Sequence, residues 1–134
     1  LLVNPIHMAS IYSAFANNGK MVKPYLEYSN GKVDYEDVFS EESANIVKDA
    51  LIQVVESGTA TDMKIPGLTI AGKTGTAELK TSSEDTESGT LGWFDCFTTN
   101  RLEGNLLIVG MVENTQNNSS GGSHYIISKI KNIL

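Results

Sequence analysis

Three extended segments in the second half of the chain constrain its fold most strongly. Residues 68–79, 91–99 and 106–113 are rich in β-branched and aromatic side chains and are bounded by turn-forming sequences, which is typical of β-strands. Only the short turn 101–105 separates the last two, so we expect them to form an antiparallel hairpin. The continuously apolar residues 106–109 predict that the third strand is buried on both faces.

Three amphipathic helices are predicted around these strands. Asn4-Pro5 combines a side-chain cap with a proline suited to the first helical position, and Gly19 supplies a left-handed stop. A second helix runs from about Ser40 to Gly58, and a third begins near Ser123. The apolar residues that recur at helical spacing are Met8, Ile11, Tyr12 and Phe15, then Val47, Leu51, Val54 and Val55, and finally Ile126, Ile130, Ile133 and Leu134.

The remaining segments complete the fold prediction. Residues 20–39 indicate a hairpin around the turn Asn30-Gly31, and the polar, acidic loop 80–90 is expected to be mobile. The 134 residues, 40% of them hydrophobic, suit one packed domain. We therefore expect an α+β fold in which an antiparallel sheet of at least three strands is covered by helices.

Composition excludes several classes of function. The net charge is −6, and nucleic-acid binding requires a basic surface instead. The one cysteine, Cys96, rules out an internal disulfide framework and a cysteine-rich zinc site. His7 and His124 show no ligand spacing and are expected to be structural, so the sequence predicts no metal and no cofactor. No apolar run approaches the roughly 20 residues of a membrane-spanning helix.

The segment Gly72–Glu78 is the most informative for chemistry. A lysine between two glycines is unusual in a strand, because glycine weakens strands and marks close approach of a ligand or another backbone. Strand alternation places Thr74 and Thr76 on one face and Lys73 on the other. Two hydroxyls and an ammonium beside the bare main chain of Gly75 suit a carboxylate, and backbone N–H groups there could serve an oxyanion. The competing interpretation is a polar edge strand with a solvated lysine.

A nucleotide-binding loop is a second alternative for this segment. Gly67, Gly72, Lys73 and Thr74 match the spacing of a phosphate-binding loop. Such a loop requires a helix directly after the lysine. Here Gly75 and a β-type sequence follow, which disfavours nucleotide binding.

Four sequence matches resemble penicillin-binding protein transpeptidase domains. Gly72–Glu78 and Gly92–Phe94 are similar to the family's third and fourth strands. Residues 4–17 resemble the helix after its active-site core, and Ser57–Ala60 resembles the helix end before its K-T-G strand. The matches occur in family order and span nearly the whole chain. They imply a partial penicillin-binding, serine β-lactamase-like transpeptidase fold, and Glu78-Leu79-Lys80 favours class B and its low-affinity, resistance-type branch.

The resemblance implies a serine-type D,D-transpeptidase that acts on the D-alanyl-D-alanine end of peptidoglycan stem peptides and is trapped by β-lactams. Lys73 would supply positive potential, and Thr74 and Thr76 would hold the carboxylate of the donor or drug. The N–H of Thr76 would form half of the oxyanion hole. Gly75 would let the main chain approach the substrate.

The family's S-x-x-K and S-x-N motifs precede K-T-G. Three short matches to them, Ser128–Lys131, Ser29–Lys32 and Ser43–Asn45, stand in the wrong places and are not expected to be catalytic. Residues 1–134 are therefore predicted to be a C-terminal fragment whose nucleophile lies upstream of Leu1. Alone it should be inactive. The parent is expected to be extracytoplasmic, anchored in the membrane through an N-terminal segment outside this chain.

Three further expectations follow from the resemblance. The strand 106–113 should pair with a strand from the missing N-terminal part of the same protein, which leaves an edge open to self-association. Trp93 and Phe94 should pack the sheet, and Asp95 departs from the small or apolar residue expected there, which weakens the prediction for the end of that strand. The alternatives are a fragment of a β-lactamase or β-lactam sensor, or a non-catalytic module that keeps the fold.

Overall fold

The computed structural model describes residues 3–25, 27, 33–79, 82, 89–115 and 121–134. The predicted Asn30-Gly31 turn, the predicted mobility of the loop 80–90 and the match Ser29–Lys32 fall wholly or largely outside these residues.

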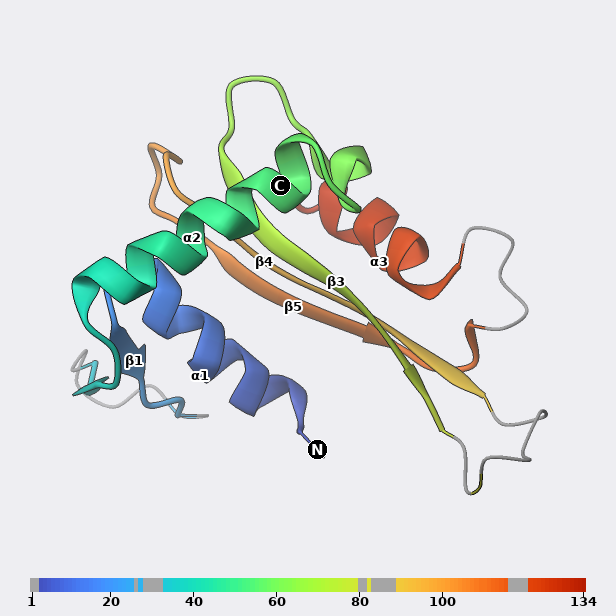
Figure 1. Ribbon diagram of the computed structural model, residues 1–134, viewed down its shortest axis with the longest axis horizontal. Helices are drawn as coiled ribbons and strands as arrows, with labels where there is room; N and C mark the ends of the chain where they lie inside the picture. Colours follow the sequence, from blue (N-terminus) through green and yellow to red (C-terminus); the bar gives the residue numbers. More distant parts are fainter. Residues whose placement is uncertain (1–2, 26, 28–32, 80–81, 83–88, 116–120) are drawn as a thin grey trace.

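The chain folds into an antiparallel sheet with helices on both faces (Figure 1). The main sheet has the order β3-β4-β5 with both pairings antiparallel, and β1 and β2 form a separate hairpin. This confirms the predicted α+β class and the hairpin of the last two strands. No helix within the described ranges is long and apolar enough to cross a membrane. In chain order the elements are α1 (Pro5–Ala16), β1 (Lys20–Val22), β2 (Tyr35–Asp37), α2 (Glu41–Glu56), the 3-10 turn η1 (Thr61–Met63), β3 (Ile70–Glu78), β4 (Thr90–Thr98), β5 (Leu107–Val112) and α3 (Gly122–Lys131).

Side-chain caps fix where the first two long helices begin. The Asn4 carboxamide accepts the N–H of His7 at 2.8 Å, and the Ser40 hydroxyl accepts the N–H of Ser43 at 3.1 Å. Each bond satisfies one backbone donor that a helix start leaves unpaired. After α1 the chain turns through Gly19 at φ +93°, the left-handed conformation that the sequence predicted.

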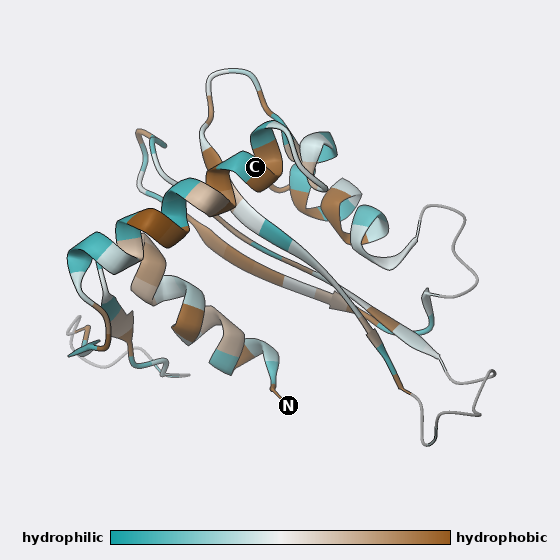
Figure 2. Cartoon of the chain, in the orientation of Figure 1, coloured by the Kyte–Doolittle hydropathy of each residue, from teal (hydrophilic) through white to brown (hydrophobic). Residues whose placement is uncertain are grey.

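The core consists of two clusters on opposite faces of the sheet. Helix α2 contributes to both clusters, because Leu51 packs in the cluster that faces α1 and Val55 in the cluster that faces α3. Apolar and polar segments alternate along this helix in Figure 2. The face toward α1 holds Tyr12, Leu51, Ala71 and Phe97. The face toward α3 holds Val55, Ala60, Met63, Ile70, Phe94, Cys96, Ile126, Ile127 and Ile130. Alternate residues of β3 and β4 thus bury into different clusters.

Two burial predictions are wrong. Strand β5 is only half-buried and Met111 within it is exposed, because β5 is the last strand of the sheet and no described strand covers its outer edge. A continuous run of apolar residues predicts an apolar strand, but it does not show whether another strand lies beside it. Ile133 is 66% exposed, because α3 ends at Lys131 and the helical spacing stops there.

Helix α3 approaches β4 at a contact between two glycines. A Cβ atom built on Gly92 would lie 2.5 Å from the Cα of Gly122, and one built on Gly122 would lie 2.7 Å from the Cα of Gly92. Because the atoms in contact belong to the main chain, a side chain at either glycine would force helix α3 away from strand β4. The hydroxyl of Thr115 also bonds the Thr90 hydroxyl at 2.6 Å beside this contact.

We expect Gly92→Ala to destabilise the protein by about 1–3 kcal/mol, because the added methyl group overlaps backbone atoms and not a flexible side chain. Urea unfolding followed by circular dichroism measures this loss. Ala77→Ser, which adds one atom at an exposed position of β3, is the control and should stay within about 0.5 kcal/mol of wild type. Equal stability of Gly92→Ala and wild type would contradict the close approach of α3.

Candidate active site

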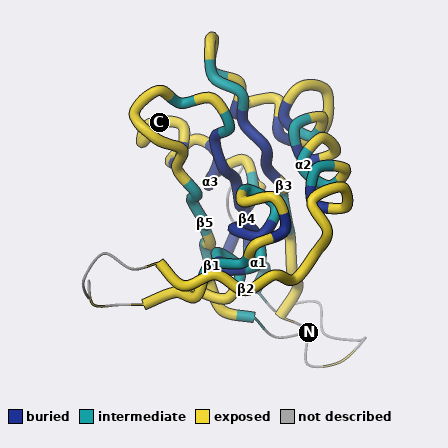
Figure 3. Tube along the Cα trace, turned by 90° about the vertical axis from the view of Figure 1, so that its left-hand side faces the viewer, coloured by how far each residue is buried: buried dark blue, intermediate teal, exposed yellow. Residues whose placement is uncertain are grey.

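The K-T-G segment lies where β3 leaves the core. Ile70–Gly72 are buried, Lys73 is exposed, and Thr76–Glu78 are exposed (Figure 3). Strand β3 is also an edge strand, since only β4 pairs with it among the described residues. The predicted extended segment is therefore confirmed, and it presents one main-chain edge away from the sheet.

The nucleotide-binding alternative is wrong. Strand β3 continues through Lys73 to Glu78, so the residues directly after the lysine form a strand and not a helix. A phosphate-binding loop depends on a helix N-terminus at that point. Gly72 also has a packing role, because a Cβ atom there would lie 2.9 Å from the ring of Phe94.

The functional side chains divide between the two faces of β3, as strand alternation predicted. Lys73 pairs in register with Asp95 and lines a pocket of about 240 Å³ with Tyr12 of α1. Thr74 turns its hydroxyl to the end of α2, where its Oγ1 lies 2.8 Å from the Oγ1 of Thr59. Thr59 belonged to a predicted sequence match, but its bond to Thr74 could not be read from the sequence because it joins residues 15 apart.

The arrangement suits recognition of an anionic group at the edge of β3. The Lys73 ammonium donates to the carbonyl oxygen of Thr74 at 2.7 Å and so lies along the strand. The Thr76 side chain is exposed beyond it. At Gly75 an added Cβ would crowd Trp93 at 3.2 Å, so the missing side chain makes room for the tryptophan, and both residues line the pocket. Ammonium and hydroxyl donors together are the groups that bind carboxylates.

Trp93 and Phe94 behave differently from each other. Phe94 is fully buried in the cluster facing α3, which agrees with its predicted packing role. Trp93 is half-buried and lines the pocket beside Lys73 and Gly75. It therefore contributes an aromatic wall to the site.

Asp95 is the residue of this region whose role the sequence prediction missed. It departs from the small or apolar residue expected at this position, yet β4 runs on through Thr98. The Asp95 side chain is 4% exposed, and its Oδ1 has no hydrogen-bond partner among the described residues. Burial raises the pKa of Asp95 to about 6. Burial, followed by the charge of Asp95, raises the pKa of Cys96 to about 12 and that of Tyr12 above its ordinary value.

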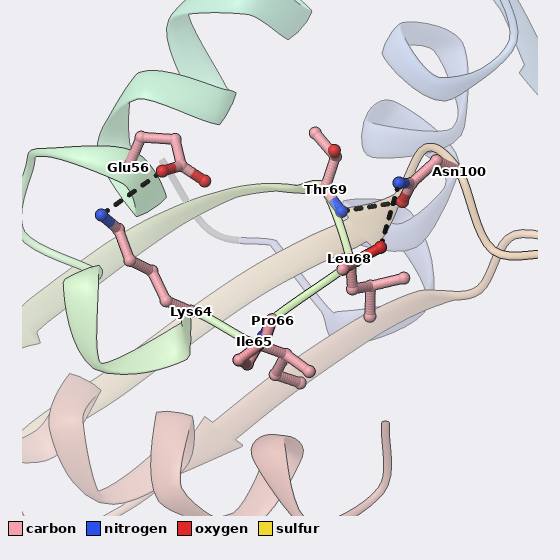
Figure 4. Close-up of a pocket in the computed structure, with 8 residues that line it drawn as sticks. Glu56, Lys64, Ile65, Pro66, Leu68, Thr69 and Asn100 are labelled. Atoms are coloured by element: carbon pink, nitrogen blue, oxygen red, sulfur yellow. Dashed lines mark hydrogen bonds and ion pairs between the residues drawn. The ribbon is translucent and has the colours of Figure 1, made fainter.

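A larger pocket of about 520 Å³ lies away from K-T-G, beside the loop before β3 (Figure 4). Several of its polar groups bond one another. Lys64 and Glu56 form an ion pair at 3.3 Å, and the Asn100 carboxamide accepts from Thr69 N at 2.7 Å and donates to Gly67 O at 3.2 Å. These bonds hold the loop that precedes β3.

The other candidate residues have structural partners. His124 bonds Asp62 at 3.0 Å and so ties α3 to η1, and Ser128 donates to a carbonyl of its own helix. Ser43 lies in the first turn of α2 beside Ser40. Within the described part of the chain no three His, Cys, Asp or Glu side chains gather as metal ligands.

Comparison with known proteins identifies the family. The family model "Penicillin binding protein transpeptidase domain" matches residues 1–133. Penicillin-binding protein 3 of Bacillus subtilis (strain 168) is 38% identical over 134 residues, covering 96% of this chain but 20% of that protein.

Solved structures share the fold. A provisionally assigned peptidoglycan glycosyltransferase from Atopobium parvulum superposes with a TM-score of 0.73 at 27% identity, covering 96% of this chain and 32% of that one. The D,D-transpeptidase domain of a peptidoglycan glycosyltransferase from Eggerthella lenta gives a TM-score of 0.65 at 27% identity, covering 94% and 31%. The chain thus spans a third or less of the length of these relatives. With its K-T-G strand at a sheet edge, it belongs to the penicillin-binding protein transpeptidase domain family.

Proposed function

We propose that this chain is the C-terminal part of the catalytic domain of a serine-type peptidoglycan D,D-transpeptidase. The observation that carries the proposal is the position of Lys73-Thr74-Gly75-Thr76, extended along the open edge of β3 where the strand leaves the core. The relatives are described as penicillin-binding or D,D-transpeptidase proteins, which supports the same reaction for the parent.

In the proposed reaction a serine from the upstream part of the protein attacks the carbonyl of the penultimate D-alanine. The ester forms as terminal D-alanine leaves, and the amine of a second stem peptide then displaces the serine. Thr74 and Thr76 hold the carboxylate of the donor, and Lys73 provides positive potential. The N–H of Thr76 forms half of the oxyanion hole, and Gly75 admits the substrate to the main chain.

The proposal extends to the setting of the parent protein. The upstream chain supplies the S-x-x-K and S-x-N motifs and an N-terminal membrane anchor, which places the domain outside the cytoplasm. Placement in class B and its low-affinity branch rests on Glu78-Leu79-Lys80. A β-lactamase or sensor fragment is less well supported, because the relatives are penicillin-binding proteins. A non-catalytic module would lack S-x-x-K in the upstream reading frame.

Residues 1–134 alone should not react with fluorescent penicillin, because the serine nucleophile is missing and its loss removes most of the rate enhancement of serine enzymes. Gel fluorescence after incubation measures the labelling. The parent protein is the positive control and should become covalently labelled. A covalent adduct on the isolated 134-residue chain would contradict the assignment of the nucleophile to the upstream part.

In the parent, Thr74→Val should lower the second-order rate of penicillin acylation by about 10- to 100-fold. Loss of one hydrogen bond to a charged group costs about 1.5–3 kcal/mol, and about 1.4 kcal/mol corresponds to a factor of ten. Stopped-flow fluorescence gives the rate. Thr69→Val, at a threonine whose hydroxyl makes no hydrogen bond in the described structure, is the matched control. An unchanged rate in Thr74→Val would remove this threonine from the carboxylate site.

The isolated chain should self-associate through β5. Its outer edge has no partner among the described strands, and we propose that an upstream strand of the parent covers it. Unpaired apolar edges recruit other chains, and lysine suppresses this. Light scattering should therefore show dimers or larger species for the chain alone, and Met111→Lys should reduce them. A strictly monomeric chain would argue against the open edge.

A further inference from the structure

A buried acid beneath the K-T-G lysine has no role in the reaction described above. Asp95 is 4% exposed and lines the pocket of about 240 Å³ between α1 and the sheet. Its Oδ1 is fully enclosed and has no hydrogen-bond partner among the described residues. Such an atom costs free energy unless a partner reaches it. Buried polar atoms without partners are rare in folded proteins, so this one indicates an interaction that the resting side-chain positions do not show.

Lys73 is the group placed to reach Asp95. The two residues are directly opposite in the β3–β4 register, so their side chains leave the same face of the sheet. Opposed Cβ atoms in antiparallel strands are about 4.5–5.5 Å apart. The Lys73 ammonium is turned toward the carbonyl of Thr74, at 2.7 Å, and does not form an ion pair with Asp95. An ammonium has three donors, so two are left after this bond.

The pocket provides both room and isolation for such a pair. Its volume of about 240 Å³ accommodates rotation of the lysine or a bridging water, which takes up about 30 Å³. Among the described residues that line the pocket, Tyr12 of α1 is the titratable group besides Lys73 and Asp95, and its raised pKa keeps the phenol uncharged at neutral pH. From β5 the residue opposite Asp95 is Val109. Among the described residues lining the pocket, Lys73 is the one cation.

We propose that Asp95 is a positioning residue for transpeptidation: its carboxylate is the counter-ion that holds the Lys73 ammonium aligned along β3. This inference rests on the proposed function. Burial raises the pKa of Asp95 to about 6, so the carboxylate is ionised at neutral pH and available to the lysine. An opposite charge on the same face of the sheet attracts the ammonium and restricts its positions. Without it, the Lys73 side chain would sample more positions, and the ammonium would bind the substrate carboxylate less well.

The test uses Asp95→Asn in the parent protein, with two readouts. The first is the second-order rate of fluorescent-penicillin acylation at neutral pH. The second is the ¹³C-methyl NMR signal of Lys73 after reductive methylation with ¹³C-formaldehyde, assigned with Lys73→Arg. We expect the rate to fall about tenfold because the ammonium is no longer held, and the Lys73 signal to shift and sharpen as the side chain gains freedom. Asp95→Glu should restore them. Cys96→Ala, at the buried neighbour on the opposite face of β4, should leave both unchanged.

The outcomes separate the two proposals. No acylation of the wild-type parent would refute the proposed function, whereas the NMR measurement would still decide the role of Asp95. A Lys73 signal that is the same in Asp95→Asn and wild type overturns the inference, even when the acylation rate falls. A lower rate with an unchanged signal would mark Asp95 as structural. If Asp95→Asn does not fold, Asp95→Ser provides the same comparison.

Discussion

The pairing of β3 with β4 is the interaction on which the rest of the structure depends. It runs without a break from the Ile70–Thr98 pair to the Glu78–Thr90 pair. One end of this ladder is buried between helices, and the other end projects beyond them (Figure 1). The hydrogen bonds between β3 and β4 continue from the buried end of the pair to the exposed end. Packing at the buried end therefore also fixes the positions of Lys73 and Thr76, although these two residues lie outside the core.

This division explains how a polar edge strand can be rigid enough to bind. The apolar anchors Ile70 and Ala71 lie in different clusters, one on each face of the sheet. Rotation of β3 about its axis would remove one of them from its cluster, at a cost of about 1 kcal/mol or more for each buried methyl-rich side chain. The faces presented by Lys73 and Thr74 are therefore fixed. The Lys73 side chain lines the pocket between the sheet and α1, and the Thr74 hydroxyl contacts Thr59 at the end of α2.

Much of the fold was predictable because its signals are local. The cap Asn4, the helix start near Ser40 and the turn at Gly19 depend on neighbours within a few residues, and the structure confirms them. The errors arose where the outcome depends on distant neighbours. The half-burial of β5 reflects the absence of a described strand beside it, and the exposure of Ile133 reflects where α3 stops. An apolar side chain favours burial, but whether it is buried depends on which helices and strands pack against it.

The sequence by itself determined that positions 73 to 76 form a strand, that lysine and threonine side chains leave it on opposite faces, and that glycine bares the main chain between them. Period-two geometry and the residue types suffice for those conclusions. Only the tertiary structure decided that Thr59 meets Thr74 and that Asp95 lies buried opposite Lys73. Those contacts join segments separated by a helix end or a hairpin, and their register and burial are set by the packing of the whole domain.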